Sequence, residues 1–159
     1  MGRREFDEFY AAHFDDVARA ISLAAGDREL ARDATQEAFA RALRRWRRVR
    51  DMDRPDGWVY VVAMNRLRDH WRRLDREQPV GSVDVESNGA VVTRLTVREA
   101  IATLPPRQRQ AVVLRYLADL PLADVADAMG CALGTVKATL HQALRAMRVE
   151  LEEDEDADR

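Results

Sequence analysis

The side chains best suited to chemistry in this chain are cations and short polar groups on the face of one helix. Within residues 135–145 this face comprises Thr135, Lys137, Ala138, His141, Gln142 and Arg145. Short polar side chains at the start of a helix, with cations among them, suit the major groove of DNA, because they reach base edges and phosphates. The chemistry indicated here is nucleic-acid binding.

A second group of cations lies between Arg41 and Arg73, where eleven arginines stand against four aspartates and leave a local charge of +7. The formal net charge of the whole chain is only −2, partly because residues 150–158 carry seven acids and no base. A basic surface with an acidic chain end indicates a polyanionic partner for the basic part. A merely solvated arginine-rich surface is the alternative that composition leaves open.

The sequence contains no pattern typical of an enzyme or a metal site. His13, His70 and His141 stand in separate helical segments without the spacing of a metal-binding motif. Cys131 is the only cysteine, which excludes an internal disulfide and a cysteine-rich zinc site. We therefore predict no catalytic residue, no metal, no cofactor and no small-molecule substrate.

The elements that must position these groups are helices, since no segment alternates apolar and polar residues over the length of a strand. Apolar residues at helical spacing predict helices over about residues 6–24, 30–46 and 55–74. Gly26 ends the first of these helices, and Asp27 is a good N-cap for the second. The predicted fold class is all-α.

Residues 104–151 predict a helix-turn-helix. Val125, Ala126 and Met129 form the apolar face of a short helix, and Gly130 follows where a left-handed residue ends it. Apolar residues then recur at helical spacing along a longer second helix, at Val136, Leu140, Ala143, Leu144, Met147 and Leu151. A plain helical hairpin in a bundle is the alternative for this segment alone.

The chain divides into two small helical domains joined by a flexible linker. Proline, glycine, serine and acids interrupt the helical pattern after Asp75. The predicted boundaries are 1–75 for the first domain, 76–90 for the linker, 91–151 for the second domain and 152–159 for an acidic, disordered tail that does not extend the last helix. No run is apolar enough to span a bilayer, and the N-terminus lacks a secretory signal, so we expect a cytoplasmic protein.

Three segments resemble the extracytoplasmic-function sigma factors, a short class of the sigma-70 family of bacterial RNA polymerase sigma factors with domains two and four only. ARDATQEAFARALRRW, residues 31–46, is similar to the helix that docks on the largest polymerase subunit. WVYVVAMNRLRDHWRR, residues 58–73, is similar to the helix that meets the promoter −10 element. Residues 104–148, with the LPPRQRQ opening and the GTVK start of the recognition helix, are similar to the −35 reader.

The resemblance implies a non-enzymatic transcription initiation factor. Such a protein binds core RNA polymerase, directs it to promoters by recognising −35 and −10 elements, and promotes DNA melting. The partners implied are core RNA polymerase, promoter DNA and an anti-sigma factor that holds the chain inactive until a signal releases it.

The candidate polymerase-binding residues lie at three- and four-residue spacing on one helix. They are Asp33, Gln36, Glu37, Phe39 and Arg41. A mixed polar surface with an aromatic ring at its edge suits a protein partner. The alternatives are that Phe39 belongs to the core and that the acids form a solvated face.

The candidate −10 residues combine an amide, which can pair with a base edge, with arginines, which bridge phosphates or stack on an unstacked base. They are Arg47, Arg48, Arg50, Arg54, Asn65, Arg66, Asp69, Arg72 and Arg73. Arg47 to Arg54 precede the helix in a loop that is placed to hold single-stranded DNA. Asn65 is alternatively a structural amide with satisfied hydrogen bonds.

The candidate −35 residues are the polar face of residues 135–145 described above, with Thr139, Arg107 and Arg109 added. Many family members have serine-arginine after GTVK and a further arginine three residues later, where this chain has Ala138, Thr139 and Gln142. The logarithm of the DNA-binding constant falls linearly with the logarithm of the salt concentration, and each lost phosphate contact makes this slope shallower by about 0.9. We therefore expect a −35 contact that is weaker alone or has different base preferences.

Two other kinds of binding protein remain as alternatives. A repressor or response regulator would use the same helix-turn-helix, but it leaves the helix of residues 31–46 and the Asn65–Arg73 group unexplained. A decoy that binds polymerase or an anti-sigma factor without reading DNA is favoured by the substitutions at Ala138 and Thr139, and opposed by Lys137 and the basic −10 helix.

Overall fold

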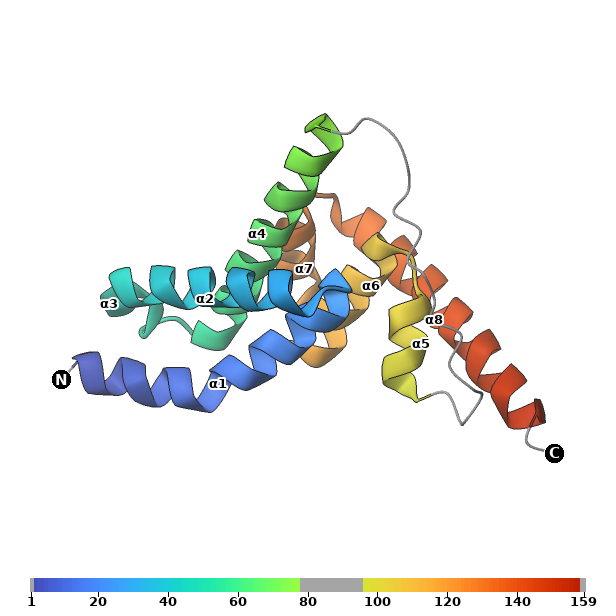
Figure 1. Cartoon of the computed structure of the whole chain (residues 1–159), viewed down its shortest axis with the longest axis horizontal. Coiled ribbons are helices and arrows are strands. Elements are labelled where there is room, and N and C mark those ends of the chain that lie inside the picture. Colours follow the sequence, from blue (N-terminus) through green and yellow to red (C-terminus); the bar gives the residue numbers. More distant parts are fainter. Residues whose placement is uncertain (1, 78–95, 158–159) are drawn as a thin grey trace.

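The first half of the chain folds into a helical unit around the long helix α4. The computed structural model describes residues 2–77 and 96–157, with side chains described as far as Arg148. The unit consists of α1 (Gly2–Ala25), α2 (Arg28–Arg44), α3 (Trp46–Val49) and α4 (Pro55–Glu77). α1, α2 and α4 pack against one another (Figure 1).

Local chemistry explains where α1 ends and α2 begins. Gly26 takes a left-handed backbone conformation with φ of +67° and follows the last residue of α1. Asp27 then caps α2, because its carboxylate accepts a hydrogen bond of 3.1 Å from the Leu30 backbone N–H. The boundary between α1 and α2 therefore lies where the sequence predicts it.

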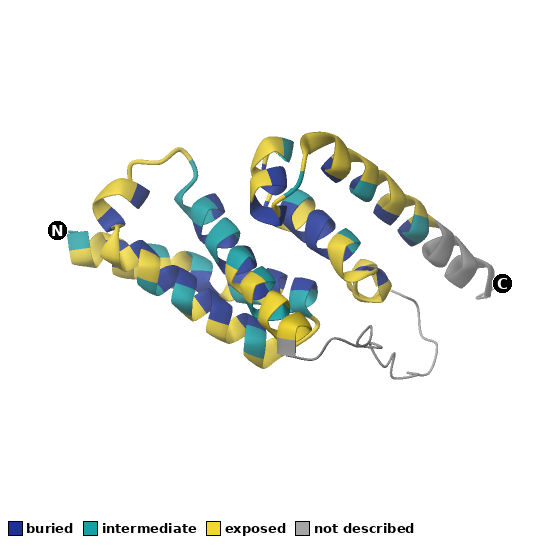
Figure 2. Ribbon diagram, turned by 90° about the horizontal axis from the view of Figure 1, so that it is seen from above, coloured by how far each residue is buried: buried dark blue, intermediate teal, exposed yellow. Residues whose placement is uncertain are grey.

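An aromatic cluster fills the core between α1 and α2. The centroid of the Phe39 ring lies 5.8 Å from that of Phe9, 5.1 Å from Tyr10 and 5.4 Å from Phe14. The Trp46 ring meets Phe6 edge to face at 5.4 Å. Buried residues therefore line the inward faces of these helices, and exposed residues cover the outside (Figure 2).

Replacing Phe39 by alanine is expected to destabilise the first unit by about 3–5 kcal/mol, because it removes a fully buried ring and leaves a cavity. All three tryptophans lie in this unit, at positions 46, 58 and 71, so tryptophan fluorescence during urea unfolding reports on this unit. Leu43→Ala on the same helix is the control, because Leu43 is 38% exposed. Equal unfolding midpoints for the two variants would contradict this account of the core.

The second unit contains the predicted helix-turn-helix. Its elements are α5 (Val97–Thr103), α6 (Pro106–Val112), a π-helical turn η1 (Val113–Leu117), α7 (Leu122–Met129) and α8 (Leu133–Ala157). Thr96 and Glu99 form a capping box at the start of α5. Gly130, with φ of +63°, ends α7 as predicted, and the turn leads directly into α8.

The two units pack on each other along one seam. α7 lies against α4, and α6 and η1 lie against α1, although these pairs are far apart in sequence (Figure 1). The described residues contain helices and turns but no strand, which confirms the all-α prediction.

Two predicted boundaries are wrong. α4 continues through Glu77, so the predicted linker does not begin at residue 76; the rest of the linker, 78–90, lies outside the described residues. α8 continues to Ala157, where a disordered tail was predicted from residue 152. Extension of a helix that already exists is cooperative, and glutamate and alanine are good helix formers. Unfavourable charge at a helix C-terminus costs only tenths of a kcal/mol, which is too little to end α8 at Leu151.

Candidate polymerase and nucleic-acid interfaces

The predicted polymerase-binding face lies on the outer side of α2. Asp33, Gln36 and Arg41 are exposed, and Glu37 is half-buried. One Glu37 carboxylate oxygen accepts a hydrogen bond of 3.1 Å from Arg41 Nε, and Nη2 of Arg44 lies 3.7 Å from the same oxygen. The helix therefore presents an ordered patch of both charges with an amide beside it.

Phe39 does not belong to this face, because its ring is 2% exposed and packs in the aromatic cluster. The prediction that Phe39 anchors a protein partner is wrong for that reason. Leu43 is an apolar side chain that sequence reasoning missed. It is exposed, and it follows Gln36 by seven residues, which is about two helical turns and the same side of the helix.

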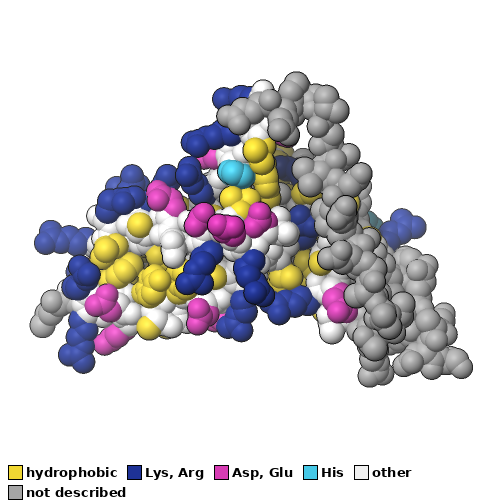
Figure 3. Space-filling model, viewed as in Figure 1, with side chains coloured by type: hydrophobic (Ala, Val, Ile, Leu, Met, Phe, Trp, Pro, Cys, Tyr) yellow, Lys and Arg dark blue, Asp and Glu magenta, His cyan; other side chains and the backbone are white. Residues whose placement is uncertain are grey.

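The predicted −10 residues on α4 form a basic exposed surface. Arg66, Asp69, Arg72 and Arg73 are all exposed, and Arg76 extends the series toward the end of the helix. Basic side chains gather at the upper end of α4 (Figure 3). This arrangement suits a backbone-tracking contact with a nucleic-acid strand.

Asn65 lies on the same helix but is half-buried. Its side-chain oxygen Oδ1 is buried and has no hydrogen-bond partner among the described residues. A buried polar atom without a partner is rare and costly, so the alternative of a structural amide with satisfied hydrogen bonds does not hold for Oδ1.

The arginines before α4 have different surroundings. Arg47 and Arg48 are exposed on α3, a short helix within the segment where the sequence predicted a loop. Arg50 donates a hydrogen bond of 3.1 Å to the Glu5 carboxylate on α1. Arg54 points to the second unit and donates to the backbone oxygens of Ala118 at 2.7 Å and Asp119 at 2.6 Å.

Arg54 also forms an ion pair with Asp56, with Nη2 and Oδ2 separated by 2.8 Å. The hydrogen bond to Asp56 raises the pKa of the Arg54 guanidinium above its usual value. Burial acts to raise the pKa of Asp56, but the hydrogen bond and charge of Arg54 outweigh it, and the pKa is lowered. Arg54 is therefore held in place by protein groups, and its predicted role in holding single-stranded DNA is wrong for this conformation.

The predicted −35 face lies on α8 and is open to solvent. Thr135, Lys137, Ala138, His141, Gln142 and Arg145 are all exposed. The opposite face is buried at Val136, Leu140, Ala143 and Met147, as predicted, whereas Leu144 is 43% exposed. The structure thus brings the predicted base-reading positions onto one side of one helix.

Three further −35 candidates make hydrogen bonds within the protein, unlike the residues of the exposed α8 face. Thr139 is half-buried, and its hydroxyl donates a 2.7 Å hydrogen bond to the Thr135 carbonyl on its own helix. Arg107 donates a 3.4 Å hydrogen bond to the Met129 carbonyl. Arg109 is only 3% exposed and donates at 3.0 Å to the Ala24 carbonyl of α1, so the prediction that it contacts phosphate is wrong for this conformation.

In the described part of the chain, no group of three or more histidine, cysteine, aspartate or glutamate side chains is arranged to hold a metal ion. No helix within the described ranges is both long and apolar enough to cross a membrane.

Comparison with protein families identifies both units. Residues 9–77 match the family described as Sigma-70 region 2, and residues 94–147 match Sigma-70, region 4. The chain is 33% identical over 154 residues to the RNA polymerase sigma-E factor of Streptomyces avermitilis, covering 93% of this chain and 86% of the relative. It is also 33% identical over 138 residues to the ECF RNA polymerase sigma factor SigL of Mycobacterium tuberculosis, covering 80% of this chain and 78% of the relative.

Two solved structures share the fold. The sigma factor RpoE of Bartonella quintana, solved in complex with the anti-sigma factor NepR, superposes with a TM-score of 0.65 at 19% identity, covering 98% of this chain and 99% of that chain. CnrH, solved with the cytosolic domain of CnrY, superposes with a TM-score of 0.59 at 20% identity, covering 96% of this chain and 90% of that chain.

Proposed function

The chain belongs to the extracytoplasmic-function group of the sigma-70 family, and we propose on that premise that it is the subunit that gives core RNA polymerase its choice of promoter. It binds core enzyme, recognises −35 and −10 elements and promotes melting of the DNA. The polymerase carries out RNA synthesis, so this chain needs no catalytic group of its own.

One observation carries this proposal: a single chain presents two separate exposed surfaces suited to DNA, each on the unit with the matching family region. The basic face of α4 lies within the region 2 match, and the polar face of α8 lies within the region 4 match. Binding that favours a separated strand over the duplex shifts the melting equilibrium without an energy-consuming step. Asn65, Arg66, Arg72 and Arg73 on α4 are the residues we assign to that step.

We assign residues 1–77, which end with α4, to domain two, and residues from 91 to the end of α8 at Ala157 to domain four, with the intervening residues as a linker. The outer face of α2, with Asp33, Gln36, Glu37 and Arg41, is the proposed polymerase contact. The face of α8 from Thr135 to Arg145 is the proposed −35 reader. Arg47 and Arg48 complete the −10 group as exposed cations on α3.

We also propose regulation by an anti-sigma factor in the cytoplasm. The sigma factor RpoE, which shares the fold, is bound to the anti-sigma factor NepR, and CnrH, which also shares it, is bound to the cytosolic domain of CnrY. The two-unit architecture offers such a partner surfaces on both units. A repressor would not account for the region 2 match, and a decoy that does not read DNA would not account for the open polar face of α8.

The proposal is tested by transcription in vitro with core RNA polymerase and a library of promoter sequences. The chain is expected to select a subset of templates that share two elements, one at −35 and one at −10. Core enzyme without the chain is the control and should show no such enrichment. Tight binding of the free chain to one operator, with no effect of core enzyme, would favour the repressor instead.

A further inference from the structure

The exposed face of α8 is divided lengthwise into two edges of different chemistry. A helix turns by about 100° per residue, so residues three, four and seven positions apart share an edge. One edge is uncharged and carries Thr135, Ala138 and Gln142. The neighbouring edge is basic and carries Lys137, His141, Arg145 and Arg148. We call them the uncharged edge and the basic edge of α8.

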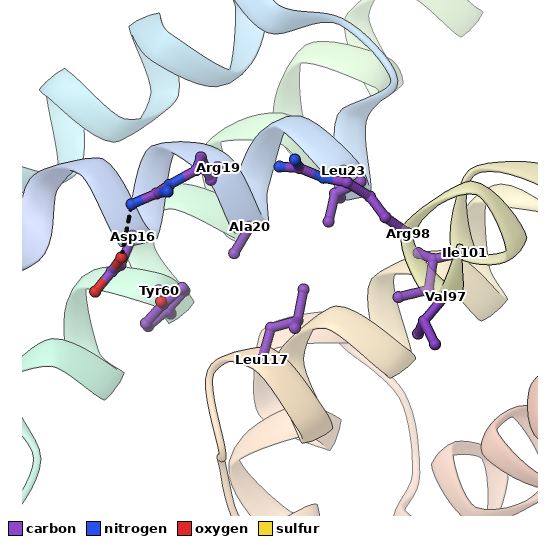
Figure 4. A pocket seen from close by; sticks show the side chains of 9 residues that line it. All are labelled: Asp16, Arg19, Ala20, Leu23, Tyr60, Val97, Arg98, Ile101 and Leu117. Carbon is purple, nitrogen blue, oxygen red and sulfur yellow. Dashed lines mark hydrogen bonds and ion pairs between the residues drawn. The ribbon is translucent and has the colours of Figure 1, made fainter. Parts of the chain in front are cut away.

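Both edges are open to a partner, because every side chain on them is exposed. The buried residues of α8 lie on the opposite side of the helix, at Val136, Leu140, Ala143 and Met147. A groove of about 530 Å³ between the two units is lined by described residues of α1, α4, α5 and η1, and by none of α8 (Figure 4). The face of α8 is therefore a surface of its own, separate from that groove.

The uncharged edge is also free of contacts within the described part of the chain. Gln142 makes no hydrogen bond or ion pair with any residue that the structure describes. Thr139, by contrast, is half-buried and donates its hydroxyl to the Thr135 carbonyl at 2.7 Å, so it serves its own helix. A Cβ atom added at Gly134, in the first turn of α8, would point into open space. The Gln142 amide and the Ala138 methyl group thus remain available to an external partner.

The two edges suit different parts of a DNA duplex. A recognition helix in the major groove meets base edges and also the phosphates that border the groove. Cationic side chains neutralise phosphates, so the basic edge suits the backbone of one strand. The uncharged edge has no cation to hold a phosphate, and we therefore place it against the bases.

The side chains of the uncharged edge distinguish between base pairs. A glutamine amide donates and accepts at once, which matches the N6 donor and the N7 acceptor of adenine. An alanine methyl group packs against the C5 methyl group of thymine. Guanine presents two acceptors, N7 and O6, which arginine or lysine fills with two donors, and neither residue type lies on this edge. The uncharged edge therefore favours A·T pairs over G·C pairs.

From this division we propose that Gln142 and Ala138 determine the specificity of the −35 reader, and that the base pairs facing them are A·T. Gln142 binds the adenine of one pair, and Ala138 contacts the thymine methyl group of another. Four residues of helix rise by about 6 Å, which is about two base steps, so both pairs belong to one short element. The inference rests on the proposed function for the place of this element at −35, but not for the base preference itself.

Selection from a random library of DNA duplexes measures the base preference without polymerase. The full chain is mixed with the library at low salt, where phosphate contacts are strongest, and the bound duplexes are sequenced. We expect an enriched motif with two A·T positions about two base pairs apart. The position that depends on Gln142 is expected to prefer A·T over G·C by about tenfold, and the position that depends on Ala138 by less.

Three variants assign these positions. Gln142→Ala is expected to remove the preference for adenine at one position only. Gln142→Arg is expected to change the same position to G·C, because an arginine fills both acceptors of guanine. Ala138→Gly is expected to remove the preference for thymine at the other position. Both residues are exposed, so the variants should keep the helical content of the unmodified chain, which circular dichroism checks.

Lys137→Ala is the matched control, because it removes an exposed side chain from the basic edge next to Ala138. It is expected to weaken binding to all duplexes alike and to make the salt slope shallower by about 0.9, with an unchanged motif. A selected library without enrichment would overturn the inference. So would G·C at the position that depends on Gln142, or a motif that both Gln142 variants leave unchanged.

Transcription with core RNA polymerase separates this inference from the proposed function. The selected motif, placed at −35 of a promoter chosen by the holoenzyme, is expected to give about tenfold more transcript than a template with G·C at both positions. Gln142→Arg should reverse the order at its own position. If no template is transcribed while the selected motif still depends on Gln142, the base preference stands and the proposed function fails.

Discussion

The double substitution Gln36→Ala with Glu37→Lys is expected to abolish recovery of this sigma factor with core RNA polymerase. Glu37 now accepts from Arg41 and lies near Arg44, so a lysine there would place three cations together on the outer face of α2. Loss of a central interface residue costs about 2 kcal/mol or more, which is about 30-fold in affinity, and charge reversal adds repulsion. The measurement is co-purification with core enzyme, followed by a binding titration.

The matched control is Glu8→Lys on α1. Glu8 also pairs with an arginine one turn away, with Arg4 Nε at 3.4 Å, and it is exposed, but it lies outside the α2 face. Both proteins should keep the helical content of the unmodified chain, because the replaced side chains are not in the core. Core binding at unmodified affinity by the double variant would remove α2 from the polymerase interface.

The second large effect is expected in promoter melting. Asn65→Ala and Arg72→Ala should each reduce open-complex formation by about tenfold or more, since a base-edge pair or a stacked base contributes about 1–3 kcal/mol. Asn65 Oδ1 lacks a protein partner but is buried, so pairing with a base requires a change of the side-chain conformation, whereas Arg72 offers an exposed guanidinium on the same helix. Permanganate reactivity of thymines across the −10 region measures the open complex.

Arg76→Ala is the control for melting. It removes the same charge from the last turn of α4, one turn beyond Arg72, and tests whether position or charge decides the effect. Recovery of the holoenzyme should be the same for all three variants, because α2 is unchanged. Thymine reactivity equal to that of the unmodified protein in Asn65→Ala and Arg72→Ala would take these residues out of the melting step.

What the sequence determined by itself is the local structure and the family. The 3.6-residue spacing of apolar positions predicts the helices, Asp27 and Gly130 mark helix boundaries through their own side-chain and backbone chemistry, and the GTVK segment starts the recognition helix where α8 begins. These features depend on residues within a few positions of one another, so they are readable from the chain. The exposed face of α8 follows from the same periodicity.

Only the tertiary structure decided which candidate residues are free to bind a partner. Phe39 lies in the aromatic core because α1 brings Phe9, Tyr10 and Phe14 against α2. Arg54 meets Asp119 across 65 positions of sequence, and Arg109 meets Ala24 across 85, so no local pattern distinguishes them from exposed arginines such as Arg72. The physical reason is that an arginine side chain suits a phosphate and a helix-end carbonyl equally well, and the packing of the two units determines which acceptor lies within its reach.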